Sequence, residues 1–164
     1  MALRLSVLAA LRGIMTGSPD IGTADYNLDM PTVLKEFGPG ASAGQVSKLF
    51  TDRRTLAGSA SEDLDLSGAL VDPLGQPAVF TVVKALLVKA DPANANAVIV
   101  GGASANGFVG PFGAANDTVA VPPGGCLLLV HPGAGWTVTA STADLLHIVN
   151  GGAGNATYDI VIAG

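Results

Sequence analysis

The sequence predicts an all-β protein: a single β-sandwich or jelly-roll-like domain preceded by an extended N-terminal arm. Three observations favour this fold class. The 164 residues include 22 glycines and 10 prolines, too many for long helices or a coiled coil. Apolar residues make up 49% of the chain and the net charge is only −5, which disfavours disorder. From about residue 61 onward, short apolar runs alternate with turn sequences.

Eight short apolar runs predict the strands of the domain. The segments between them combine Pro with Gly or Asn, residues that favour turns. Such a series of short strands is typical of a β-sandwich or jelly roll, and no helical pattern intervenes to suggest an α/β fold. In the last strand, Tyr158, Ile160 and Ile162 are expected on one face. The expected strands are residues 63–66, 78–89, 97–100, 118–121, 126–130, 136–139, 145–149 and 158–162.

Residues 1–60 are predicted to form an extended arm with little regular structure, and residues 61–164 the β-sandwich domain. In the first segment, apolar residues show no sustained period and are repeatedly interrupted by glycine and proline. A helix over residues 2–15 is the main regular element expected there. The arm is expected to become ordered against whatever it lies on.

Charge is distributed unevenly along the chain. All eight Lys and Arg residues lie in the first 89 positions, and residues 90–164 carry only four charged side chains, all aspartates. Because interface cores are depleted in charge, this predicts a surface covered by protein neighbours. The alternative is a small β-domain with a surface of Ser, Thr, Asn and Gly. No basic patch suggests nucleic-acid binding, and no apolar run approaches the length of a membrane span.

Few side chains offer chemistry. The single cysteine, Cys126, lies in an apolar run and is expected to be buried and inert. His131 and His147 could form an acid–base or metal pair, and Asp63 and Asp65 could share a strand face as catalytic carboxylates or Ca²⁺ ligands. A structural role is the simpler explanation for each. We therefore predict no catalytic residue, no metal site and no cofactor.

Aromatic side chains are candidates for recognition. Phe108 and Phe112, in the glycine-rich residues 107–113, are candidates for exposed loop anchors that bind a partner or a sugar. The alternative is that both fold back onto the core. Trp136, the single tryptophan, is expected in the core rather than stacked on a carbohydrate.

Candidate partner contacts lie in the arm and at its junction with the domain. Arg53 and Arg54 form the densest basic spot of the sequence, next to Asp52. They could form local ion pairs or dock on an acidic partner surface. The complete set of predicted partner-contact residues is Leu3, Leu5, Tyr26, Phe37, Phe50, Arg53 and Arg54.

Several segments resemble one class of virus protein. They are residues 52–56, 63–75, 83–89, 98–102, 121–125, 145–152 and 158–162. Together these segments look like those of small virion proteins of tailed bacteriophages, and the best match is a capsid decoration (cement) protein with a β-sandwich domain. The resemblance covers residues 50–164, and its motifs are structural rather than catalytic.

The resemblance implies a virion structural protein that is not an enzyme. Decoration proteins are made in the host cytoplasm and bind the outer surface of the expanded capsid. They often bind as trimers and hold neighbouring coat subunits together. The expected partners are the major capsid protein and further copies of this chain, in a homotrimer, with no nucleic acid and no membrane. An arm that adds a strand to an exposed sheet edge would suit this role.

Two other functions are considered. A receptor- or glycan-binding module of a phage tail or head spike would present Phe108, Phe112 and Trp136 on adjoining loops. A hydrolase on a jelly-roll scaffold would need clustered carboxylates and histidines, and the chain has only two histidines.

Overall fold

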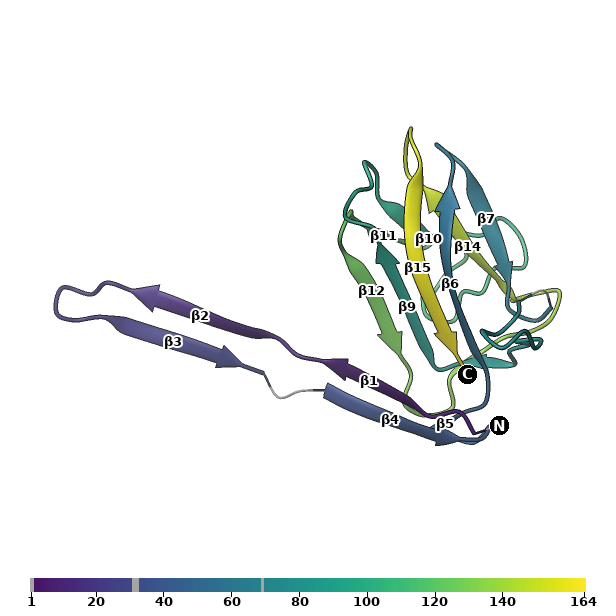
Figure 1. The fold of residues 1–164 in the computed structure, drawn as a ribbon, viewed down its shortest axis with the longest axis horizontal. Helices are drawn as coiled ribbons and strands as arrows, with labels where there is room; N and C mark the ends of the chain where they lie inside the picture. The colour runs from purple at the N-terminus through teal and green to yellow at the C-terminus, as the bar shows by residue number, and fades with distance from the viewer. Residues whose placement is uncertain (1, 31–32, 69) are drawn as a thin grey trace.

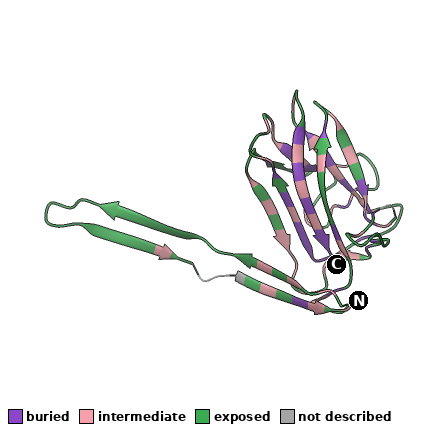
Figure 2. Ribbon diagram, in the orientation of Figure 1, coloured by how far each residue is buried: buried purple, intermediate pink, exposed green. Residues whose placement is uncertain are grey.

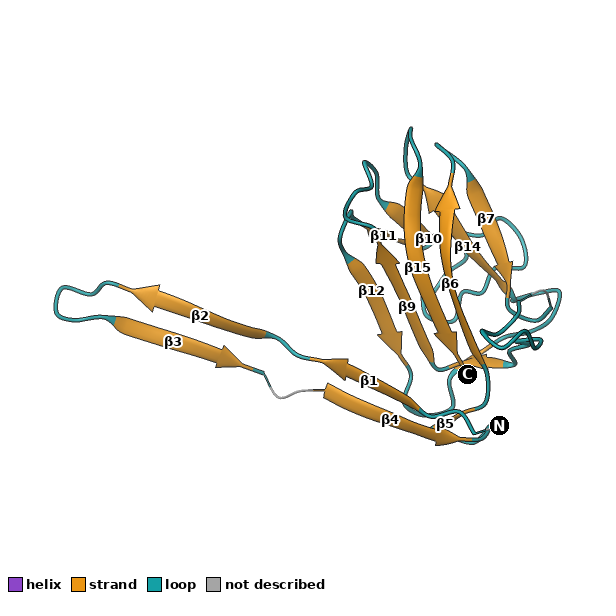
Figure 3. Cartoon of the chain, viewed as in Figure 1, coloured by secondary structure: helices purple, strands orange, loops and turns teal. Residues whose placement is uncertain are grey.

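The computed structural model describes residues 2–30, 33–68 and 70–164. Every regular element assigned within them is a β-strand, and turns and loops connect the strands (Figure 3). This confirms the predicted all-β class. The strands form a two-sheet sandwich and a long arm that projects from one end of it (Figure 1).

Each sheet of the sandwich has four strands. One sheet contains, in spatial order, β12 (Cys126–Val130), β9 (Ala85–Ala90), β15 (Ala156–Ala163) and β6 (Leu49–Leu56). The other contains β11 (Thr118–Val121), β10 (Val98–Gly101), β14 (Leu145–Asn150) and β7 (Ser61–Asp65). Neighbouring strands are antiparallel in both sheets.

The pairing of these eight strands follows the jelly-roll topology. In chain order, the first strand pairs with the eighth, the second with the seventh, the third with the sixth and the fourth with the fifth. This is the arrangement obtained when one long antiparallel hairpin is rolled into two sheets. The topology brings β6 beside the C-terminal strand β15 and places the arm, which precedes β6, at that end of the sheet.

The core lies between the two sheets. In β15, Tyr158, Ile160 and Ile162 are fully buried and alternate with side chains that face outward, as the sequence predicted. The neighbouring strand β9 contributes the fully buried Leu86, and β14 of the opposite sheet contributes the fully buried Ile148. Burial of each such side chain contributes about 2 kcal/mol before the entropy of ordering the chain is counted.

The expected strand over residues 78–89 is interrupted. Only β8 (Val82–Val83) and β9 are strand in this segment. β8 pairs with the short β13 (Trp136–Thr137), whereas β9 pairs with β12 and β15. The chain therefore changes partners at Lys84, which a continuous apolar run in the sequence does not reveal.

The arm is a β-ribbon, and the expectation of little regular structure was wrong. β1 (Leu5–Ala9) pairs with β4 (Val33–Pro39), and β2 (Arg12–Gly17) pairs with β3 (Ala24–Asp29). The end of β4 also pairs in parallel with the short β5 (Gln45–Val46). The helix expected over residues 2–15 does not form, because the backbone groups there are paired across the ribbon. The predicted boundary at residue 60 was also too late, because β6 belongs to the sandwich.

A small second core fixes the base of the arm. Phe37 and Val46 of the arm pack with Ala85 and Ala163 at one end of the sandwich, and all four are buried. Half-buried side chains surround them: Leu3, Leu5, Val7, Leu49 and Val130. The base of the arm is therefore held against one end of the β12-β9-β15-β6 sheet.

Lys84 ties the arm to the sandwich. Its ammonium group is fully buried and donates hydrogen bonds to the backbone carbonyls of Ala41, Ser42 and Gln45, at 3.3, 2.9 and 2.7 Å. Two of these carbonyls lie in the turn that precedes β5, and the third belongs to Gln45, the first residue of β5. The three bonds use all three donors of the ammonium group. Burial lowers the pKa of Lys84. Gly135 packs on this side chain, where an added Cβ would lie 2.9 Å from Lys84 Cγ.

Replacing Lys84 should loosen the arm without unfolding the sandwich. Lys84→Met keeps most of the buried stem but leaves the three carbonyls without their donor, which should cost about 2 kcal/mol of unfolding free energy. Limited proteolysis should then cut within residues 40–48 while the sandwich stays resistant. Lys89→Met, which removes an exposed lysine from the adjacent strand, should change stability by less than about 0.5 kcal/mol. Equal protease resistance of the two variants would show that Lys84 does not hold the arm.

Candidate interaction surface

The outer half of the arm is exposed on both faces. Every residue of β2 and β3 is exposed except Leu28, which is half-buried (Figure 2). Residues directly opposite each other in a two-stranded ribbon lie on the same face. The strand register therefore divides these side chains into two faces of different chemistry.

One face of the ribbon is uncharged and the other is polar. Met15 pairs with Tyr26 and Gly13 with Leu28, while Arg12 pairs with Asp29, to which its guanidinium Nε donates a hydrogen bond of 2.9 Å. The face that we call the apolar ribbon face consists of Gly13, Met15, Gly17, Ala24, Tyr26 and Leu28. The opposite, polar ribbon face consists of Arg12, Ile14, Thr16, Asp25, Asn27 and Asp29.

The apolar ribbon face has no partner within the described part of the chain. Met15 is 70% exposed and Tyr26 is 61% exposed. A two-stranded ribbon is marginally stable in water unless one face packs against something. Burying side chains of this size stabilises by about 1.5–3 kcal/mol each. This face is therefore suited to contact with another protein.

A second apolar surface lies on the outer face of the β12-β9-β15-β6 sheet. The strand register aligns outward-facing residues in rows that cross the sheet. The row nearest the arm is covered by the arm base and consists of Val130, Ala85, Ala163 and Leu49. The next row is only partly covered and consists of Leu128, Leu87, Val161 and Thr51.

A groove separates this second row from the arm. It has a volume of about 460 Å³ and is lined by residues 5–8 of β1 and by Ala85, Leu87, Cys126, Leu128 and Val161 of the sheet. None of these side chains is charged. We call this feature the apolar groove. Cys126 is exposed here, so the expectation that it is buried was wrong: it occupies an outward-facing position of its strand.

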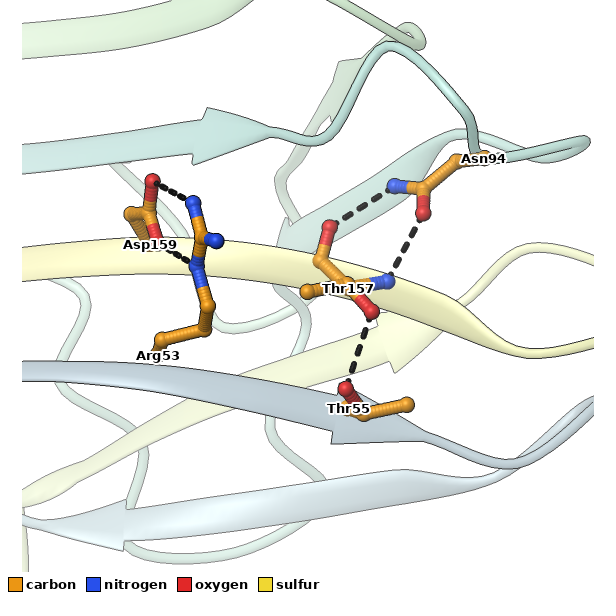
Figure 4. Close-up of polar contacts among 5 residues, drawn as sticks. All are labelled: Arg53, Thr55, Asn94, Thr157 and Asp159. Carbon is orange, nitrogen blue, oxygen red and sulfur yellow. Dashed lines mark hydrogen bonds and ion pairs between the residues drawn. The ribbon is translucent and has the colours of Figure 1, made fainter.

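Above the groove the same sheet face becomes polar (Figure 4). Arg53 donates two hydrogen bonds to the carboxylate of Asp159, from Nε at 2.6 Å and from Nη2 at 2.9 Å. This hydrogen bonding raises the pKa of Arg53 and lowers that of Asp159. Beside this pair, the Asn94 side chain bonds both backbone groups of Thr157, and the Thr157 hydroxyl meets that of Thr55 at 2.9 Å.

Arg54 is also paired within the chain. Its guanidinium donates to Glu62 at 2.6 Å and to Asp52 at 2.8 Å, and Glu62 also accepts a 2.7 Å bond from the hydroxyl of Tyr158. The hydrogen bond to Glu62 raises the pKa of Arg54, and burial raises the pKa of Tyr158. These contacts connect β6 and β15 of one sheet to β7 of the other. Both arginines thus form local ion pairs, one of the two roles considered from the sequence.

The other predicted contact residues differ in exposure. Tyr26 is exposed on the apolar ribbon face, and Leu3 and Leu5 are half-buried at the arm base. Phe37 and Phe50 are buried in the two cores, so neither is available to a partner in this conformation. The expectation that they contact a partner does not fit their burial.

The loop aromatics pack on the core. Phe108 is buried, with only 3% of its surface exposed, and Phe112 is half-buried against the same core. Of the two alternatives for Phe108, the structure therefore shows the one in which it folds back onto the core, and its backbone N–H bonds to the carbonyl of Leu145. Trp136 is also half-buried against this core, and its ring meets that of His131 edge-on, with the centroids 5.4 Å apart.

The residues considered for catalysis are dispersed. His147 Nδ1 lies 2.6 Å from Asp63 Oδ1 across β14 and β7, whereas His131 Nδ1 accepts N–H groups from Gly133 and Gly135. Asp65 accepts hydrogen bonds from the backbone and hydroxyl of Ser67. Within the described residues, no group of three His, Cys, Asp or Glu side chains is placed to hold a metal ion.

Sequence reasoning missed several residues of the two apolar surfaces. Met15 and Leu28 belong to the ribbon, and Leu87, Leu128 and Val161 to the groove. In residues 24–29, apolar and polar residues alternate, and this could have identified one strand of the ribbon face. Residues 13–17 show no such alternation, because Ile14 is apolar and two of the five residues are glycine. The groove carries no such signal, because it forms between an arm strand and a sheet of the sandwich.

Comparison with known proteins adds no relative: no family model, no curated protein and no solved structure matches the chain. In residues 2–30, 33–68 and 70–164, no helix is long and apolar enough to cross a membrane.

Because the outer ribbon contributes to neither core, the sandwich should fold without it. Replacing residues 10–32 by Asn-Gly joins the paired residues 9 and 33 through a two-residue turn and retains the arm base. Thermal unfolding of this ribbon-deleted variant should shift by no more than a few degrees. A large loss of stability would show that the outer ribbon supports the domain.

Proposed function

We propose that this protein is a structural subunit of a bacteriophage virion that binds the outer surface of the capsid and stabilises contacts between major coat subunits. The observation that carries the proposal is the projecting arm with its uncovered apolar ribbon face. An apolar surface of this kind, on an element that leaves the domain, functions by packing against another protein.

The length of the arm supports a bridging role. At about 3.3 Å per residue, residues 5–17 span about 40 Å. A domain of about 100 residues has a radius of gyration of about 13 Å. The arm therefore reaches across a neighbouring domain, which is what a protein that joins shell subunits requires.

The charge distribution also supports extensive protein contact. Residues 90–164 contain four aspartates and no basic residue, and one of these aspartates, Asp159, is already paired with Arg53. Protein interfaces are depleted in charge at their centres. The receptor- or glycan-binding alternative is weaker, because Phe108 is buried and Phe112 and Trp136 pack on the core.

The copy number of this chain in purified particles tests the location. Particles isolated on a density gradient should contain the protein in amounts close to equimolar with the major coat protein, as quantified by mass spectrometry. A small fraction of that amount would place it at a vertex, neck or tail and favour receptor binding. Its absence from the particles would contradict a virion role.

The ribbon-deleted variant tests the role of the arm. Full-length protein added to particles that lack it should bind and raise their resistance to heat. The ribbon-deleted variant should bind at least about tenfold more weakly, because it loses the ribbon's apolar contacts with its neighbours on the shell, whether these are coat subunits or further copies of this chain. Asn27→Ser, which changes the polar ribbon face, should bind like the full-length protein. Equal binding of the ribbon-deleted variant would overturn this role of the arm.

A further inference from the structure

We propose that the apolar groove binds the apolar ribbon face of a second copy of this chain, so that copies assemble head to tail. This inference goes beyond the proposed function, because it concerns contacts between copies and does not require a capsid. It rests on two exposed, uncharged surfaces of one chain that lie apart in the folded molecule (Figure 1).

The groove has the properties of a site for apolar side chains. Its volume of about 460 Å³ lies within the range of binding pockets, and its lining is uncharged. Leu128 and Val161 form its floor on the sheet, and Leu5 and Val7 of β1 form its wall on the arm. Water in such a groove gains few hydrogen bonds, so replacing it with apolar side chains is favourable.

The ribbon supplies matching side chains. Met15, Tyr26 and Leu28 project from its apolar face, and the other positions of that face are Gly13, Gly17 and Ala24. These small residues allow a close approach of the ribbon backbone to another surface. Neither surface presents a charge that would have to be desolvated without a partner.

Within one folded chain the two surfaces lie apart. The wall of the groove is β1, and the ribbon continues from β1 away from the sandwich (Figure 1). The β1–β4 ladder, whose register holds from Leu5 to Ala9, lies between the groove and the ribbon. In this conformation, a ribbon that fills the groove comes from another molecule.

A second copy fits this role better than an unrelated protein. Each copy provides one ribbon and one groove, so a closed assembly of identical chains covers the apolar ribbon face and the apolar groove of every copy. Because the two surfaces differ, the contact is heterologous. Such contacts close into a ring when the rotation that relates one copy to the next is a whole fraction of a full turn. An arm of about 40 Å can extend from one domain to a neighbouring domain, which suits a ring of few copies such as a trimer. The polar ribbon face, with its Arg12–Asp29 ion pair, remains available to water or to a shell.

The single cysteine provides a direct test. Cys126 is exposed and lines the groove, so a cysteine introduced on the apolar ribbon face should approach it in the assembly. In Met15→Cys, oxidation by diamide should join residue 15 of one chain to Cys126 of the next, and a non-reducing gel should show dimers and trimers. Peptide mapping should identify the 15–126 disulfide.

Asn27→Cys is the matched control, because it places an equally exposed cysteine on the polar ribbon face. It should yield at least about tenfold less disulfide to Cys126. Equal cross-linking of the two variants, or exclusive formation of symmetric 15–15 disulfides, would overturn the proposal. So would sedimentation of the wild-type protein as a monomer at every concentration.

Complementary variants test the head-to-tail geometry. Leu128→Lys places a charge in the groove and Tyr26→Lys places one on the ribbon, and both positions are already exposed, so folding should be retained. Each variant alone should sediment as a monomer. An equimolar mixture should form a one-to-one dimer, because the intact ribbon of the first fits the intact groove of the second. Absence of this dimer would contradict the proposal.

The outcomes separate this inference from the proposed function. Monomeric wild-type protein that still requires its ribbon to bind particles would overturn the contact between copies and leave the capsid role intact. A cross-linked ring that is absent from purified particles would support the contact between copies and contradict the capsid role.

Discussion

The apolar face of a two-stranded ribbon cannot be buried within the ribbon itself, and this constraint governs the molecule. Met15 and Tyr26 lie side by side on one face of a ribbon that leaves its own domain. Three or more strands, or packing on another element, are needed for such a ribbon to be stable in water. We infer that the outer ribbon needs a partner for its stability, whereas the jelly roll has a core of its own.

The base of the arm fixes the direction in which the arm leaves the sandwich. Lys84 and the small core around Phe37 fix where the arm leaves the sandwich, and the same strand that begins the arm forms one wall of the apolar groove. The base of the arm and the groove are thus held in a fixed relation. A fixed relation between two complementary surfaces is what a closed, repeating assembly requires.

The strands of the sandwich could be predicted because each is either an alternation of apolar and polar residues or a short apolar run, with turn residues on both sides. Two of them, β11 and β12, have the predicted bounds. The arm could not, because its strands pair with one another and glycine and proline interrupt their alternation. Nothing in the sequence around Lys84 indicates that this lysine is buried. Its burial depends on residues 41–45, which are distant in the sequence and cover it only in the folded chain. Cys126 reads as buried because its run is apolar, although that strand lies at a sheet edge with one face outward. Tyr26 was the predicted contact residue that the structure places on the apolar ribbon face.

Hydrogen exchange of the ribbon amides, measured over a range of protein concentrations, tests most directly whether the ribbon depends on a partner. At low concentration, amides of β2 and β3 should exchange close to the rate of an unfolded chain, while amides of β15 stay protected. At high concentration the ribbon amides should become strongly protected and those of β15 should not change. Ribbon protection that is the same at every concentration would contradict the account.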